Sequence, residues 1–340
     1  MNWARSYTSE WRVFRVNRKT WADGEKLSGV DSASITRTAD GSLLESGDME
    51  VTGTFETDYY RIVMTAKQGG EVVREDVATL LFDISDGEHD YGTVKNKAKG
   101  YSVLYPASTT AVTTGEYAPA GVDGAKYAKE LLESAINAPV KVEGSFILND
   151  HIVHEPGTYI LDAVWAVLNA GPDGGYVIQI DGRGVVHIRP RPTEPALVLD
   201  NAARGVILNG IEYTSDVSKI PNRYIVIDGN NKTLAVNDDP NSPVSTVKRG
   251  YYVDEVDTSP TPIDGETLGE YARRKLRQMS ILETEYSYKR EYAPTVLLYS
   301  KIRASITGLS GDLRVKSQSI DCGHGIMVSE KVTEETALWQ

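Results

Sequence analysis

The sequence contains one cysteine, Cys322, among its 340 residues. A single thiol cannot form an intramolecular disulfide or the cysteine cluster of a structural zinc site. Long apolar runs are also missing, because no stretch approaches the roughly 20 residues that a membrane-spanning helix needs. Segment 1–16 is polar and carries Arg5, Arg12 and Arg15, so it is unlike a signal peptide. We therefore expect a soluble protein that is synthesised in a cytoplasm.

Blocks of basic residues are missing as well. The chain has 36 Lys and Arg against 48 Asp and Glu, which gives a formal net charge of −12. A duplex-DNA-binding protein needs clustered cations to displace the counterions of the phosphates. We therefore expect no direct, sequence-specific binding of nucleic acid. A ring around a DNA channel can still be acidic, because an acidic lumen repels phosphate.

Phenylalanine is rare, with 4 residues, whereas tyrosine is common, with 19. A tyrosine ring is apolar and its hydroxyl is polar, so the residue suits surfaces that become half-buried in contacts. Three tryptophans, Trp3, Trp11 and Trp21, lie near the N-terminus, and Trp339 lies near the C-terminus. Because tryptophan is enriched at interface centres, we predict that these four residues contact other subunits. Packing against the chain's own strands is an equally open alternative.

The distribution of strand and helix patterns predicts three domains. Residues 1–106 contain short alternating segments separated by Gly and Asp turns, which is typical of a β-barrel-like domain. Residues 120–200 combine two amphipathic helices with strands, which predicts an α+β domain with helices packed on a sheet. Residues 201–340 return to strands and predict a second β-barrel-like domain with an inserted helical segment at 258–285. The expected fold class is therefore α+β, β-rich and multi-domain.

Local patterns predict the positions of particular elements. Apolar residues recur at helical spacing over 124–136, 159–171 and 266–280. Strand-forming segments flank Asp-Gly turns over 175–192 and 223–238, which predicts two hairpins. The first turn reads Asp181-Gly182-Arg183-Gly184 and lies between strands, so it does not have the context of a phosphate-binding loop.

Few residues suggest catalysis or metal binding. His151 and His154 have HxxH spacing rather than HExxH, and loop histidines are the simpler interpretation. The Cys322-Gly323-His324 run lacks a peptidase signature, and a glycine-containing turn explains it better. The acidic segments 237–241 and 254–257 do not follow the spacing of a calcium-binding loop. We therefore predict no catalytic residues, no metal site, no cofactor and no enzymatic activity.

Segment 120–335 resembles a known family. Its first part has the order of the central α+β domain of phage tail baseplate and tail-tip hub proteins: helix, strand, helix entered through a Gly-containing turn, Asp-Gly hairpin and Pro-rich exit. The helix "LGEYARRKLRQMS" and the terminal strand "GDLRVKSQSIDCGHGIMVSE" are also similar to that family. The residues that carry the first part of the resemblance are Gly157, Tyr159, Leu161, Asp162, Asp181, Gly182, Pro190, Pro192 and Pro195.

The resemblance implies a structural role in a virion tail, for a protein made in the bacterial host cytoplasm. It implies a homotrimer with two similar β-barrels per subunit, arranged as a pseudo-sixfold ring. Such a ring would join the sixfold tail tube or distal tail protein to the threefold tail-tip, spike or fibre protein, with the tape measure protein as a further partner. Truncation before residue 205 should then abolish ring formation. A receptor- or sugar-binding tail module is the alternative, followed by a tail-tip cell-wall hydrolase.

Overall fold

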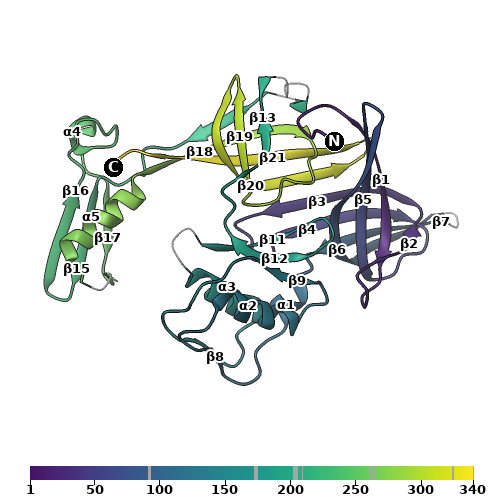
Figure 1. Cartoon of the computed structure of the whole chain (residues 1–340), viewed down its shortest axis with the longest axis horizontal. Coiled ribbons are helices and arrows are strands. Elements are labelled where there is room, and N and C mark those ends of the chain that lie inside the picture. Colours follow the sequence, from purple (N-terminus) through teal and green to yellow (C-terminus); the bar gives the residue numbers. More distant parts are fainter. Residues whose placement is uncertain are drawn as a thin grey trace. The chain divides into compact units, whose positions relative to one another are not determined.

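The computed structural model describes residues 1–90, 93–171, 175–201, 206–208, 210–260, 262, 265–323 and 325–339 (Figure 1). The chain forms two compact units. The first comprises Met1–Ile211 and Ser287–Val332, and the second comprises Glu212–Tyr286 and Thr333–Gln340. The chain is β-rich, as predicted from the sequence. The predicted domain boundaries at residues 106, 120 and 200 are not tested by this division and stay a prediction.

Thirteen strands form the largest sheet in the described part of the chain. Its order is β14-β18-β21-β20-β3-β4-β7-β6-β5-β1-β2, with β19 paired to β20 and β13 paired to β19. Its strands are β1 Thr8–Val16, β2 Asp23–Leu27, β3 Val30–Thr38, β4 Glu45–Thr52, β5 Asp58–Gln68, β6 Glu71–Asp90, β7 Thr93–Tyr101, β13 Pro195–Leu199, β14 Glu212–Ser215, β18 Ile281–Glu291, β19 Lys301–Ile306, β20 Leu309–Cys322 and β21 Ile326–Ala337.

The prediction of two separate β-barrel-like domains is wrong for the described residues, whose sheets are not closed into barrels. The reason is the length of β20. Its first part pairs with β19, and residues 317–322 pair with β3, from Ser317 opposite Thr38 to Cys322 opposite Ala33. This antiparallel pairing joins the N-terminal and C-terminal strands in one sheet, so the two blocks share hydrogen bonds instead of each closing on itself.

One face of this sheet encloses the main hydrophobic core. Alternate residues point to the same face of a strand, and strands from both ends of the chain contribute to the same cluster. The core contains Ile35, Ile62 and Phe82 from the first hundred residues, and Tyr292 and Ile320 from the last sixty, all essentially inaccessible to solvent. Burial of each large apolar side chain stabilises the fold by about 1.5–3 kcal/mol, so the two ends of the chain stabilise each other.

A buried ion pair lies next to this core. Arg290 on β18 donates two hydrogen bonds to Glu330 on β21, from Nε to Oε2 at 2.9 Å and from Nη2 to Oε1 at 2.8 Å. Gln318 and Tyr288 also donate to the Glu330 carboxylate, each at 2.8 Å. The two charges are almost completely buried, but the carboxylate has several donors, which is the condition for tolerating a charge in a low-dielectric interior.

The middle of the first unit has a small three-stranded sheet of order β11-β12-β9, with α2 packed against α3 (Figure 1). The Asp123 side chain caps α2 by accepting from the Ala125 and Lys126 amides. The two predicted helices and the predicted hairpin are confirmed, and the helices end two or three residues earlier than expected. The elements are α1 Tyr105–Thr109, β8 Glu116–Ala118, α2 Gly124–Glu133, β9 Val140–Val142, β10 Ile152–His154, α3 Ile160–Asn169, β11 Tyr176–Ile180 and β12 Val186–Pro190.

The turn of the β11–β12 hairpin packs against strand β6. A Cβ atom added to Gly182 would lie 1.8 Å from the Asp76 carbonyl oxygen, so only glycine permits this approach. The Gly182 carbonyl accepts from the Thr79 hydroxyl at 2.9 Å, and the Arg183 carbonyl accepts from buried Arg61 at 3.0 Å. The glycine that the sequence assigned to a hairpin turn therefore also fixes this hairpin to the large sheet.

The second unit has its own sheet, of order β16-β15-β17, and its own core. Helix α5 begins with a capping box formed by Thr267 and Glu270 and packs on β15 and β16. The helix confirms the prediction at 266–280, and β15 with β16 confirms the hairpin at 223–238. The elements are β15 Arg223–Asp228, β16 Asn231–Val236, α4 Thr246–Arg249, β17 Asp254–Asp257 and α5 Leu268–Met279.

Candidate assembly surface

The face of the large sheet that points away from the core is polar and charged. On β4, Met49 and Val51 are buried in the core, whereas Asp48 and Glu50 are exposed. On β20, Ile320 is buried and its neighbour Asp321 is exposed. Residues alternate between the two faces along each strand. The strand register places exposed residues beside exposed residues of the next strand, so the pattern continues across the sheet. The result is a broad hydrophilic surface over β20, β3, β4, β7 and β6.

Carboxylates flank a column of lysines on this surface. Lys97 on β7 lies opposite Glu50 on β4 and opposite Asp86 on β6. Opposite charges on directly facing positions stabilise a sheet by about 0.2–1 kcal/mol for each pair. The complete column consists of Lys95, Lys97 and Lys99, and its acidic neighbours are Asp48, Glu50, Asp83, Asp86 and Glu88. The acids outnumber the lysines, so the surface as a whole is negative.

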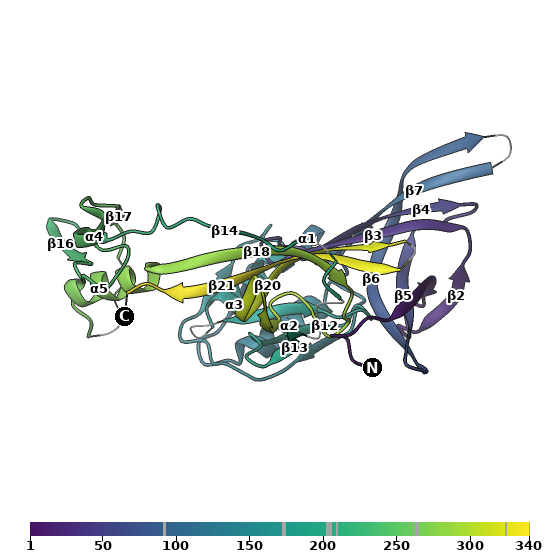
Figure 2. The same ribbon diagram turned by 90° about the horizontal axis from the view of Figure 1, so that it is seen from above.

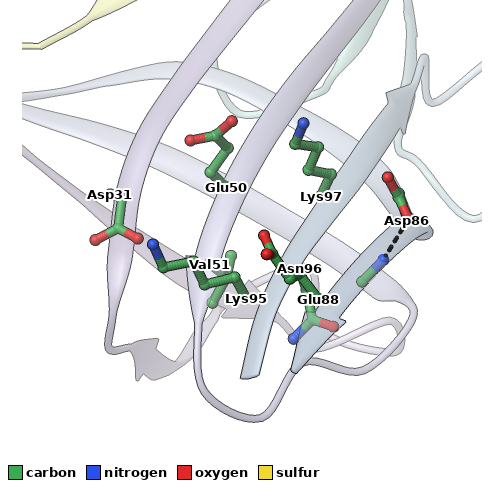
Figure 3. Close-up of a pocket in the computed structure, with 9 residues that line it drawn as sticks. Asp31, Glu50, Val51, Asp86, Glu88, Lys95, Asn96 and Lys97 are labelled. Atoms are coloured by element: carbon green, nitrogen blue, oxygen red, sulfur yellow. Dashed lines mark hydrogen bonds between the residues drawn. The ribbon is translucent and has the colours of Figure 1, made fainter. Parts of the chain in front are cut away.

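Two shallow depressions lie on this surface. The first has a volume of about 270 Å³ and brings Asp31, Glu50 and Glu88 together with Lys95 and Lys97 (Figure 3). A second depression of about 540 Å³ shares Glu50 and Lys97 with the first and continues across β3 to Asp321. Charged and small polar side chains dominate both depressions. Such a lining differs from that of a small-molecule site, which is mostly apolar with a few polar groups.

Strand β6 extends beyond its neighbour β5. The last pair between them is Phe82 with Asp58, so the following residues of β6 pair with β7 on one side only (Figure 2). The Ile84 amide donates to the Asp83 carboxylate, and the Gly87 amide donates to the Asp86 carboxylate, each at 2.9 Å. Carboxylates that cover edge amides hinder uncontrolled pairing with other strands. The projecting hairpin is therefore an acidic edge rather than an open pairing template.

The four tryptophans predicted as interface residues all contact their own chain. Trp21 is buried, and its Nε1 donates to the Arg183 carbonyl at 2.7 Å. Trp11 donates to the Gly323 carbonyl at 2.9 Å, Trp3 packs edge-on against Tyr7, and Trp339 lies under the Arg277 guanidinium. Trp3 and Trp11 pack against the main core, whereas Trp339 packs against the core of the second unit. Their role in contacts between subunits is not tested by one chain and stays a prediction.

The interpretation of His151 and His154 as loop histidines is right for exposed His151 but wrong for His154, which is buried at the end of β10. On β12, His187 has its Nδ1 3.3 Å from a Glu143 carboxylate oxygen and its Nε2 3.0 Å from an Asp181 carboxylate oxygen. Cys322 is buried, which raises the pKa of its thiol to about 12, and its predicted neighbour His324 lies outside the described residues. Across the described part of the chain, we find no cluster of His, Cys, Asp or Glu side chains suited to a metal ion. None of the helices in the described ranges is long and apolar enough to cross a bilayer.

Neither a protein-family model nor a curated protein sequence matches the chain. Solved structures do match its fold. The tail protein from Neisseria meningitidis MC58 aligns with a TM-score of 0.65 and 14% identity over 98% of each chain. The 43 kDa tail protein of prophage MuSo2 from Shewanella oneidensis aligns with a TM-score of 0.63 and 13% identity, over 95% of this chain and 97% of that one.

A third match is a chain of a two-protein complex from Francisella. A chain of the Francisella PdpA–VgrG complex aligns with a TM-score of 0.60 and 8% identity, over 98% of this chain and 53% of that one. The protein therefore has the fold of phage tail proteins. The resemblance noted in the sequence between residues 120 and 335 is confirmed at the level of the fold, and the likeness also includes the first hundred residues.

Proposed function

We propose that the chain is a non-catalytic structural subunit of a phage tail, and that three copies form a hub ring at the tail tip or baseplate. The ring would join the sixfold tail tube or distal tail ring to a threefold tail-tip, spike or fibre protein, with the tape measure protein as a further neighbour. The fold likeness to two tail proteins over nearly the whole chain supports this proposal. Contacts between subunits through Trp3, Trp11, Trp21 and Trp339 are part of it.

The observation that carries the proposal is the one-sided chemistry of the large sheet. Its hidden face is a continuous apolar core, whereas its open face is polar over β20, β3, β4, β7 and β6 and carries more carboxylates than lysines. A channel that passes DNA needs a wall that does not bind phosphate. On this wall the charges of Lys95, Lys97 and Lys99 face carboxylates on neighbouring strands, so the lysines do not create a basic track. We assign this face to the channel.

The internal organisation of the sheet also suits an adaptor between sixfold and threefold neighbours. Each chain contributes one block of strands from its N-terminal part, β1–β7, and one from its C-terminal part, β18–β21. Three chains then present six blocks to a sixfold ring, and a closed ring covers strand edges that would otherwise promote aggregation.

Solution mass tests the proposed ring. Light scattering of the purified protein over a concentration series should approach about 112 kDa, three times the 37.3 kDa of one chain. Electron microscopy of the same sample should show particles with a central opening. A protein that remains monomeric over the whole series, alone and mixed with tail-tube subunits, would contradict the proposal. Binding of cell-wall glycans by such a monomer would favour the receptor- or sugar-binding alternative.

A further inference from the structure

The sheet of the second unit has an apolar face opposite helix α5. Tyr224 and Val226 on β15 point toward the helix and are buried, so Ile225 between them points the other way. Strand register places Leu234 on β16 and Val256 on β17 directly beside Ile225. Leu234 is 50% exposed and Val256 is 51% exposed. The three side chains form an apolar row across all three strands of this sheet, which we call the unit-two row.

A preorganised aromatic and charged group borders this row. Arg223 lies two positions before Ile225 and donates to Asp254 through Nε at 2.7 Å and Nη2 at 2.6 Å. The ring of Tyr252 lies against the same guanidinium, with its centroid 3.8 Å from the central carbon. Tyr252 is itself 56% exposed. A tyrosine and an arginine held rigidly beside an apolar row are typical of the centre of a protein–protein interface.

A second exposed apolar pair lies on the small β8–β10 sheet of the first unit. Tyr117 on β8 and Val153 on β10 are directly opposite each other in the strand register. They are 61% and 62% exposed, although their neighbours Ala118 and His154 are buried. Single exposed apolar residues need no explanation, but a facing pair on a sheet is a contiguous patch. We call it the unit-one pair.

The two patches differ in the charge beside them. Lys232 is two positions before Leu234 on β16, which places it on the same face as the unit-two row. Glu155 is two positions after Val153 and is exposed next to the unit-one pair. Arg223 and, to a smaller extent, Lys232 lower the pKa of Asp254 on the same face, so the two bases and one acid leave a net positive charge beside the unit-two row. A cation at one apolar patch and an anion at the other make the two patches electrostatically complementary.

We propose that the unit-two row of one chain packs against the unit-one pair of a second copy of the chain. The inference rests on the proposed ring, and it identifies the contact through which neighbouring subunits meet. A threefold ring requires two unlike surfaces on each chain, because every subunit meets the next one head to tail. Two flat sheet faces with opposite charges beside them provide such a pair, and Lys232 then meets Glu155 of the next chain.

Cysteine cross-linking tests this contact. The native Cys322 is buried and its thiol has a raised pKa, so it should not react. Leu234→Cys and Val153→Cys are prepared as separate proteins, because both positions are exposed and tolerate a small side chain. Mixed and oxidised, the two variants should form a covalent dimer, and neither should do so alone. Val247→Cys, at an even more exposed position of the second unit, is the control for Leu234→Cys and should not cross-link to Val153→Cys.

The results separate this inference from the proposed ring. The double variant with both cysteines in one chain should give a covalent trimer as its largest product. A sample that has the mass of a trimer but no cross-link in the mixture overturns the head-to-tail contact and leaves the ring standing. Cross-linking of Leu234→Cys to itself also overturns it, because like surfaces would then meet. A monomer at every concentration without a cross-link overturns both proposals.

Charge exchange provides an independent measurement. Lys232→Glu alone and Glu155→Lys alone should each weaken trimer formation by about 5- to 30-fold, the usual effect of replacing an attractive contact by a repulsive one. The double exchange should restore most of the trimer formation, because it re-creates the ion pair with the two charges reversed. If trimer formation by the double variant is weakened as much as by the two single changes added together, the two side chains do not meet.

Discussion

At the residue scale, the Arg290–Glu330 ion pair is almost completely buried. Burial opposes the charged form of Glu330, but the Arg290 guanidinium and the donors Gln318 and Tyr288 outweigh it and lower the pKa of this carboxyl. A carboxyl whose pKa is lower in the folded than in the unfolded state stabilises the fold above its ordinary pKa of about 4.3. That contribution is lost as the pH falls through the folded-state pKa.

We therefore predict that Glu330→Gln lowers the free energy of unfolding by about 3–5 kcal/mol at pH 7, because Arg290 is left buried without its counter-charge. The difference from the unmodified protein should begin to shrink as the pH falls below about 4, because the unfolded chain then binds a proton at Glu330 that the folded carboxylate does not. It should be lost once the pH is below the folded-state pKa, where both proteins carry a neutral group at this position. Denaturant unfolding at several pH values measures it. A difference that is constant between pH 3 and pH 7 would show that the carboxylate charge is not what stabilises the fold.

Two other carboxyls calibrate this experiment. Glu334, also on β21, accepts from the Tyr286 hydroxyl at 3.1 Å in a partly exposed position, so Glu334→Gln should cost less than about 1 kcal/mol.

Glu45 contrasts with Glu330 because burial raises its pKa, although Arg37 donates to it at 2.6 Å. A raised folded-state pKa has the opposite sign, so ionised Glu45 costs stability that returns when the pH falls.

At the element scale, the acidic face of β4 and β6 makes the channel assignment testable. We predict that the triple variant Asp48→Lys, Glu50→Lys and Asp86→Lys still folds, because all three side chains are exposed. The new lysines face Lys97 and Lys99, so each facing pair should cost up to about 1 kcal/mol of stability. It should bind duplex DNA, whereas the unmodified protein should not. Each new lysine–phosphate contact should add about 0.9 to the slope of log affinity against log salt concentration. Fluorescence anisotropy with labelled DNA over a salt series measures both quantities.

A control with the same charge change distinguishes this face from the rest of the surface. Glu25→Lys, Glu194→Lys and Asp238→Lys also replace three exposed acids by three bases, but on separate elements. Scattered charges should bind DNA much more weakly than a column on neighbouring strands. Equal DNA affinity of the two triple variants would indicate that net charge alone determines DNA binding, and that the acidic face has no special role.

The sequence predicted individual elements better than their pairing. Helix periodicity identified α2, α3 and α5, and the Asp228-Gly229 signal identified the β15–β16 turn, because these features depend on neighbouring residues. The pairing of β3 with β20 joins residues nearly 300 positions apart, and no local pattern encodes it. The sequence therefore supported two barrels where the structure has one continuous sheet.

Only part of the candidate surface could be predicted from the sequence. The alternation of Asp48 and Glu50 with Met49 and Val51 indicates one charged face, and Lys95 and Lys97 follow the same period of two. The neighbouring strands that place carboxylates beside the lysines required the fold. The prediction that the four tryptophans contact other subunits rested on residue type alone. Residue type does not distinguish a contact within the chain from a contact with a partner.

At the scale of the whole molecule, the two units have separate cores. The main cluster uses residues from the first unit only, including Tyr292, Ile320 and Val328 from its C-terminal part. The second cluster, with Tyr224 and Leu276, lies entirely in the second unit. Truncation before residue 205 would remove the partner of β3 and part of the main core. Such a chain should aggregate, so its failure to assemble would not by itself test the ring.

Excision of the second unit is a sharper experiment. The Leu208 amide donates to the Lys289 carbonyl at 2.8 Å, and Ile207 forms an antiparallel bridge with Arg290. The chain therefore leaves and re-enters the first unit at adjacent positions, and a short Gly-containing turn can replace Glu212–Tyr286 if the chain also ends at Val332. We predict that this variant unfolds in one cooperative transition, because the main core is intact.

The excised variant should also remain monomeric where the complete chain is a trimer, since it lacks the unit-two row that we assign to the subunit contact. Calorimetry and light scattering of the same samples measure the two properties. A folded monomer indicates that the second unit carries one side of the contact and that the first unit is an independent folding unit. A folded trimer would leave the ring in place and transfer the subunit contact to the first unit, against the inference drawn from Leu234 and Val256.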